Sequence, residues 1–211
     1  RDIGALSNQT RGIWTGGNPG SSPNTTDQID LVTIASVGNA TDFGNLTASM
    51  KEVQSTSSPT RGIMGGGNTV PATINTIQFI TIASTGNASD FGDLTRTASS
   101  LGAVSSGTRG VFANGGSNTI DFVTIASAGN ALDFGDSTLL RAQCTATMSN
   151  SIRGVFAGGY QPSPNSTDTN TVDFITIESA GNAQDFGDIS RSGNDSNREG
   201  GGCSDSHGGL E

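Results

Sequence analysis

The chain has 211 residues, of which only 32% are hydrophobic and 5% aromatic, while glycine alone accounts for 31. Its formal net charge is −9, and it shows neither a basic stripe nor an apolar run near the roughly 18 residues of a membrane helix. These features argue against binding to nucleic acid and against membrane insertion. So polar a composition is typical of a disordered chain, or of short strands joined by many Gly, Asn and Ser turns.

The first predicted elements are short strands. Residues 1–10 contain one expected strand, from a sheet that precedes the first repeat or closes the structure. The stretch RGIWTGG from Arg11 predicts an apolar strand closed by a glycine pair. The stretch IDLVTIASVGNATDFGNLT from Ile29 predicts an alternating strand rich in β-branched residues, a Gly-Asn turn, and a short strand or bulge anchored by Phe43.

The same elements recur three more times in the same order. The long strand begins again at Ile77, Ile120 and Val172, and the Arg-Gly strand at Arg61, Arg109 and Arg153. A looser element precedes each Arg-Gly strand and carries one recurring position, occupied by Leu6, Thr56, Val104, Met148 and Cys203. The unit is therefore about 48 residues long, with approximate limits at 11–60, 61–108, 109–152 and 153–207.

Four short strands in a unit of this length are typical of a propeller blade. We therefore predict an all-β fold, a single domain over residues 1–211 that forms a β-propeller with about four four-stranded blades. The loose element occurs five times, once more than the others, so closure stays open. A four-bladed ring with overlapping ends, a larger or open assembly, and another all-β solenoid or sandwich are the alternatives.

The glycine pairs that end the Arg-Gly strands make the repeat resemble a divergent kelch-type blade. These pairs are Gly16-Gly17, Gly66-Gly67, Gly115-Gly116 and Gly158-Gly159. Basic residues near the fourth strand, at Arg96, Arg141 and Arg191, strengthen the resemblance. The Tyr and Trp usual in kelch blades are missing, since Trp14 and Tyr160 do not occupy their places.

The repeat also resembles repeat proteins of aquatic viruses, especially tailed phages of cyanobacteria. The similarity covers nearly the whole chain and includes the string CSDSHGGL from Cys203. It implies a virion or extracellular protein, such as part of a tail fibre or another appendage, and it implies no particular ligand.

Motifs that suggest chemistry have simpler interpretations, and we expect no catalytic site, metal or cofactor. Four copies of D-F-G, without H-R-D or a kinase glycine-rich loop, exclude a kinase. The alternating Cys203, Asp205 and His207 suit a weak zinc site, but an ordinary terminal strand explains them better. Both cysteines, Cys144 and Cys203, are expected to be small buried apolar residues.

The aspartates of the D-F-G motifs recur with the repeat, at Asp42, Asp90, Asp133 and Asp185. We predict that they cap turns on a solvated rim, although a propeller could instead gather them on its axis around a cation. A carbohydrate-active enzyme on that axis is a minor alternative. It would need paired carboxylates outside the repeat, and none is apparent.

The loops over 17–28, 67–76 and 159–171 differ in length and content while the strands do not, which favours them as binding loops. The candidate binding residues are Asn18, Ser21, Asn24, Asn68, Asn75, Tyr160, Asn165 and Asp168. The expected partners are a host-surface glycan or protein. The alternative is a purely architectural subunit that assembles with further copies or with neighbouring virion subunits.

Overall fold

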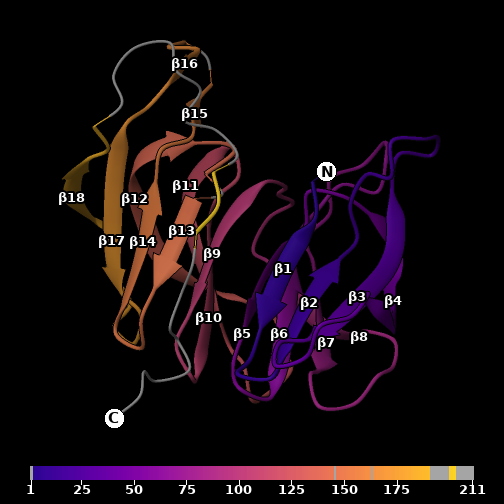
Figure 1. The fold of residues 1–211 in the computed structure, drawn as a ribbon. Helices are drawn as coiled ribbons and strands as arrows, with labels where there is room; N and C mark the ends of the chain where they lie inside the picture. The colour runs from indigo at the N-terminus through magenta and orange to yellow at the C-terminus, as the bar shows by residue number, and fades with distance from the viewer. Residues whose placement is uncertain (1, 145, 163, 191–199, 203–211) are drawn as a thin grey trace.

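The computed structural model describes residues 2–144, 146–162, 164–190 and 200–202. It confirms the all-β prediction: four four-stranded antiparallel sheets are arranged as the blades of a four-bladed propeller, and no helix occurs among the described residues (Figure 1). The same four elements build every blade, so the sequence repeat is a structural repeat.

Each blade begins with the loose element, which forms its first and innermost strand. Blade 1 consists of β1 (Gly4–Ser7), β2 (Arg11–Thr15), β3 (Thr26–Thr33) and β4 (Thr41–Met50). Blade 2 consists of β5 (Gln54–Ser57), β6 (Arg61–Gly65), β7 (Thr76–Thr81) and β8 (Ser89–Asp93). Blade 3 consists of β9 (Leu101–Ser105), β10 (Arg109–Asn114), β11 (Ser117–Thr124) and β12 (Leu132–Arg141). The strand expected in residues 1–10 is β1, which pairs with β2 inside the first blade.

Blade 4 has the same order with one insertion. It consists of β13 (Ala146–Ser149), β14 (Arg153–Ala157), β17 (Thr171–Thr176) and β18 (Gln184–Asp188). A two-stranded hairpin, β15 (Tyr160–Gln161) and β16 (Thr167–Asp168), stands between its second and third strands. The longest variable loop therefore adds a short hairpin to an otherwise constant blade.

Neighbouring blades meet through the D-F-G strand of one blade and the Gly-Asn turn of the next. In the first seam, the Gly86 amide donates to the Phe43 carbonyl at 2.7 Å, and the same bond recurs in the second and third seams at the same length. Gly44 lies so close to the backbone of Gly86 that a Cβ there would collide with it. The D-F-G glycine is thus required by the close approach of two backbones.

The phenylalanine of each D-F-G motif fills the seam. Phe43 is 2% exposed and belongs to one cluster with Ile82 and Ala88 of the next blade. Phe91 and Phe134 are buried in the same way against blades 3 and 4. The propeller core therefore consists of successive blade-to-blade clusters, because a single sheet cannot cover both of its faces.

In the three complete seams, the arginine of the Arg-Gly strand ties the other end of the seam. Arg11 donates to the Ile82 carbonyl at 2.5 Å, and Arg61 donates to the Ile125 carbonyl at 3.0 Å. The Arg61 guanidinium also lies 4.8 Å from the ring centre of Phe79 in its own blade. Arg61 and Arg109 thus each make a charge-assisted bond across the seam while stacking on a phenylalanine of their own sheet.

The seam between blade 4 and blade 1 differs from the other three. Phe186, the D-F-G phenylalanine of blade 4, is 59% exposed, and Ile34, the blade 1 counterpart of Ile82, is 57% exposed. These two faces do not cover each other, so the described residues form three complete seams and leave the fourth open.

Candidate binding surface and axial cavity

The variable loops lie at one end of the propeller. They all connect the second strand of a blade to its third strand, and equivalent connections of equivalent blades leave the ring on the same side. Blade 3 has only Gly115 and Gly116 between these strands, whereas blade 4 carries the β15–β16 hairpin there (Figure 1). Loops of unequal size on one face of a constant scaffold form a surface whose shape is set by the loops.

The blade 1 loop divides its candidate residues into one internal and two exposed side chains. Asn18 is 7% exposed, and its Oδ1 accepts a hydrogen bond from the Gly20 amide at 2.8 Å. Ser21 and Asn24 are exposed, and the Asn24 amide donates to the Ser21 carbonyl at 2.7 Å. Asn18 therefore holds the loop, while Ser21 and Asn24 are presented to solvent.

The blade 2 candidates serve the backbone. Asn68 exchanges two backbone hydrogen bonds with Lys51, and its Oδ1 accepts from the Val70 amide at 2.8 Å. Asn75 is half-buried, and its carbonyl accepts from the Leu94 amide at 2.7 Å. These two residues shape the loop more than they present a ligand-binding group.

The blade 4 hairpin carries the remaining candidates. Tyr160 and Asp168 are opposite each other in the β15–β16 pair, and Tyr160 also exchanges backbone hydrogen bonds of 2.7 and 2.8 Å with Ala142. Both side chains are half-buried, while Asn165 is exposed between the two strands. The structure places the eight candidates on three separate loops of one end, and does not gather them into a single pocket.

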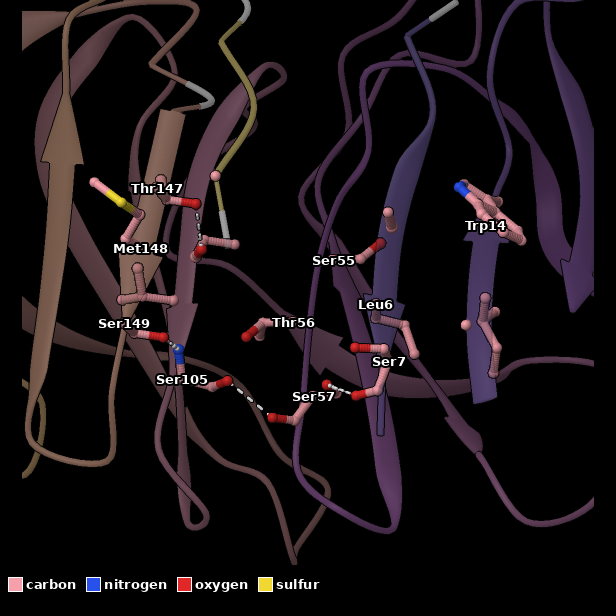
Figure 2. A pocket seen from close by; sticks show the side chains of 16 residues that line it. Leu6, Ser7, Trp14, Ser55, Thr56, Ser57, Ser105, Thr147, Met148 and Ser149 are labelled. Atoms are coloured by element: carbon pink, nitrogen blue, oxygen red, sulfur yellow. Dashed lines mark hydrogen bonds between the residues drawn. The ribbon is translucent and has the colours of Figure 1, made fainter. Parts of the chain in front are cut away.

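Sequence reasoning missed a cavity on the propeller axis. A cavity of about 380 Å³ lies among the innermost strands, with β1 and β13 on opposite sides and Thr56 between them (Figure 2). Seven of the sixteen residues that line it are serines or threonines, and Ser57 and Ser105 donate to the carbonyls of Ser7 and Ser57 at 2.7 and 2.8 Å. The loose element appeared featureless in sequence because its residues are small, and small residues are what strands converging on an axis require.

Trp14 stands at the edge of this cavity and is the chain's single tryptophan. It occupies the β2 position of Met64, Phe112 and Phe156, all of which are 0% exposed, yet Trp14 itself is 37% exposed. Its counterparts are covered by the preceding blade, as when Phe112 packs against Gly65. Trp14 is exposed because the open fourth seam leaves it uncovered.

A second hollow of about 530 Å³ continues from this cavity toward the loop end. Four residues with positive φ, one ahead of each innermost strand, contribute to its lining: Asp2, Glu52, Ser100 and Gln143. The Glu52 amide donates to the Asp2 carbonyl, and the Ser100 amide donates to the Glu52 carbonyl. These two backbone bonds join blade 1 to blade 2 and blade 2 to blade 3 near the axis.

The D-F-G aspartates lie on the outermost strands, far from the axis in the order of each sheet. Asp42 accepts the Gly44 amide at 3.1 Å, and Asp133 and Asp185 accept the equivalent glycine amides. The predicted local hydrogen bonds are confirmed for these three, but they are made at a bulge of the outermost strand and not in a turn, and the alternative of an axial cation held by them is wrong. No group of three or more candidate metal ligands occurs among the described residues.

The pKa values of Cys144 and Glu178 are shifted, each for a clear cause. Burial raises the pKa of the Cys144 thiol to about 11, and this cysteine is 0% exposed, as expected for a small apolar residue. Partial burial disfavours the charged form of Glu178. Hydrogen bonds from Ser106 and Thr108, with the charge of Arg109, outweigh that effect and lower the Glu178 pKa below its ordinary value. The proposed Cys203, Asp205 and His207 cluster, and Arg191, lie outside the described residues.

Among the described residues no helix could cross a membrane. No protein-family model matches the chain, and no curated protein matches it either. The function of this chain therefore has to be argued from the surface that its fold presents.

Proposed function

We propose that this protein is a non-enzymatic structural and adhesive module. It presents variable loops on a propeller scaffold to a glycan or protein on a host surface, as part of a viral fibre or another extracellular appendage. The observation that carries the proposal is the contrast between four nearly identical blades and the unequal loops at one end.

The chemistry of the loop end fits recognition of a polar surface. Ser21, Asn24 and Asn165 are exposed there, and hydroxyl and amide groups both donate and accept hydrogen bonds. The chain's net charge of −9 disfavours polyanionic ligands, so neutral glycans and basic or neutral protein surfaces suit it better. The relation to viral and kelch-type proteins rests on the sequence resemblance alone. The viral resemblance supplies the expected location in a virion or outside the cell.

The test replaces loops by the shortest loop in the same chain. Residues 159–170 of blade 4, and separately residues 17–25 of blade 1, are exchanged for the two-glycine connection of blade 3. Each variant and the parent chain are applied to a glycan array and to host cells. We expect the parent to bind and at least one loop variant to lose binding while its melting temperature stays close to the parent's.

A matched control changes the opposite end of the propeller. The Thr60 side chain is exposed in the turn between β5 and β6, away from the variable loops, so Thr60→Ala should leave binding unchanged. If the parent binds no surface, the adhesive role is wrong. If the parent binds and every loop variant binds equally well, the loops are not the binding surface.

The architectural alternative has its own supporting observation, which is the open seam between blades 4 and 1. Uncovered apolar side chains on two complementary faces are typical of an association surface. Sedimentation velocity at increasing concentration separates the two roles, because self-assembly through these faces requires concentration-dependent association.

A further inference from the structure

The open seam has two faces whose partners can be identified from the other three seams. Every complete seam joins a leading face, which carries the D-F-G phenylalanine and the position of Leu6, to a receiving face, which carries the isoleucine after the long strand. Blade 4 ends in a leading face and blade 1 begins with a receiving face. The other three leading faces are each covered by one blade of this repeat type.

The exposed side chains of both faces match those buried elsewhere. On the leading face, Phe186 is 59% exposed, whereas Phe43, Phe91 and Phe134 are at most 3% exposed. Gly187 has no atom near its Cβ position, although the equivalent glycines press against the following blade. Blade 4 is thus built to contact a following blade, and the described residues supply none.

The receiving face of blade 1 shows the same pattern. Ile34 is 57% exposed, whereas Ile82, Ile125 and Ile177 are at most 2% exposed. Trp14 is also uncovered on this face, as described above. Blade 1 is thus built to contact a preceding blade, and none occurs within the part of the chain that the structure describes.

The segment 200–202 indicates what occupies the space between the two faces. Gly200 and Gly202 lie against Ala146 and Thr147 of β13, so closely that neither glycine has room for a Cβ. Thr147 makes the equivalent contact one seam earlier, where its hydroxyl donates to the Ala103 carbonyl at 2.8 Å. Residues 200–202 therefore lie where the innermost strand of a following blade belongs (Figure 1).

We propose that the gap between blades 4 and 1 is the seat of a fifth blade of the same repeat type, continuous with residues 200–202. One blade supplies both missing halves, since its receiving face covers Phe186 and its leading face covers Ile34 and Trp14. A second whole copy of the chain fits less well. Its second and later blades would continue the rotation about the propeller axis and collide with blade 1. The inference is independent of the proposed loop function.

An alignment within the sequence shows which residues would complete that blade for a test. Residues 203–211 align with residues 104–112 of blade 3, so appending a copy of residues 113–141 after Glu211 supplies the missing strands. The matched control is the same extension with Asp in place of the copied Ile125. The original Ile125 is buried in the seam beside Phe91. The parent, the extended chain and the control are compared by thermal unfolding and by the fluorescence of Trp14.

We expect the extended chain to be monomeric, to melt higher than the parent, and to show blue-shifted Trp14 emission, while the control shows neither change. The substitution Phe186→Asp gives an independent test of whether Phe186 is buried. It should shift the melting temperature of the parent by less than about 2 °C, and that of the extended chain by at least about 6 °C, because only there is Phe186 buried.

Three results would overturn the proposal. The first is an equal effect of Phe186→Asp in both chains, since Phe186 would then not be covered by the added blade. The second is a large effect of Phe186→Asp in a monomeric parent, which means that blade 4 closes onto blade 1. The third is a parent oligomer that Phe186→Asp dissociates, which assigns the seam to a second copy of the chain.

Discussion

The buried ion pair between Arg141 and Asp173 offers a sharp test of how the seams are stabilised. Arg141 Nη2 lies 2.5 Å from Asp173 Oδ2, and both side chains are 0% exposed. Arg141 also donates to the carbonyls of Gly158 and Thr171 at 3.2 and 2.9 Å, and Thr138 donates to Asp173. The pair links the last strand of blade 3 to the third strand of blade 4.

The seam between blades 1 and 2 solves the same problem without charge. Met50 pairs with Thr26 as Arg141 pairs with Ser117, so the two residues are structurally equivalent. The counterpart of Asp173 in that seam is Gln78, whose Nε2 lies 3.4 Å from the Met50 sulfur. The molecule thus contains a neutral version of the same contact.

The perturbation is Asp173→Ala, compared with the double exchange Arg141→Met and Asp173→Gln. The single change leaves a buried guanidinium without its counter-ion, which costs about 3–5 kcal/mol in comparable buried pairs. For a chain of this size that corresponds to a melting temperature lower by roughly 6–20 °C. The double exchange removes both charges, and we expect it to cost less than about 2 kcal/mol.

Urea denaturation of the parent and of both variants, followed by circular dichroism, compares their stabilities. A matched single control is Asp30→Ala in blade 1, the equivalent position on the open seam, where the side chain accepts a hydrogen bond from Gln28 and is only half-buried. The reasoning is refuted if the double exchange destabilises as much as Asp173→Ala, or if Asp173→Ala costs no more than the control.

Three further predictions concern substitutions or modification at single residues. In a Cys203→Ser background, Cys144 should resist thiol reagents at pH 8 and react only on unfolding, because burial raises its pKa to about 11; rapid labelling of the native protein would contradict this. Replacing Glu178 by alanine, the residue of the other repeats, should cost under about 1 kcal/mol at pH 7. Folding lowers this pKa, so the stabilisation exists above the ordinary value of 4.5 and is lost as pH falls through the folded value; a cost unchanged at pH 2 would be inconsistent with it. Gly92→Ala should lower the melting temperature by several degrees, since its Cβ would collide with the Gly129 backbone, whereas Gly187→Ala, at the open seam, should cost clearly less.

The sequence predicts the blades well because each blade repeats one strong pattern. Residues such as Ile29 and Phe43 alternate with polar neighbours, and glycine pairs mark the ends of strands, so strand content and order follow from local signals. The role of the glycine in D-F-G could not be found that way. Gly44 is needed because Gly86, forty-two residues later, approaches it, and only the packed structure contains that contact.

The candidate site was harder to predict for the same reason. Asn18 and Asn24 have the same residue type and lie in one loop, yet the first is internal and the second exposed. The axial cavity is formed by small residues from several innermost strands, such as Ser57 and Ser105, which carry no signal individually. Trp14 seemed an irregularity of the repeat, and its position became informative only when Met64 and Phe112 were seen buried in its place.

The backbone bonds that link Asp2, Glu52 and Ser100, together with the repeated seams, make the blades nearest-neighbour units in series. Blades 2 and 3 each have two complete neighbours, whereas blades 1 and 4 each have one. Unfolding should therefore begin at the outer blades and proceed inward, as in linear repeat arrays, instead of occurring in one all-or-none step. Amide hydrogens of β6 and β10 should consequently exchange most slowly, and those of β2 and β14 should exchange first among the second strands.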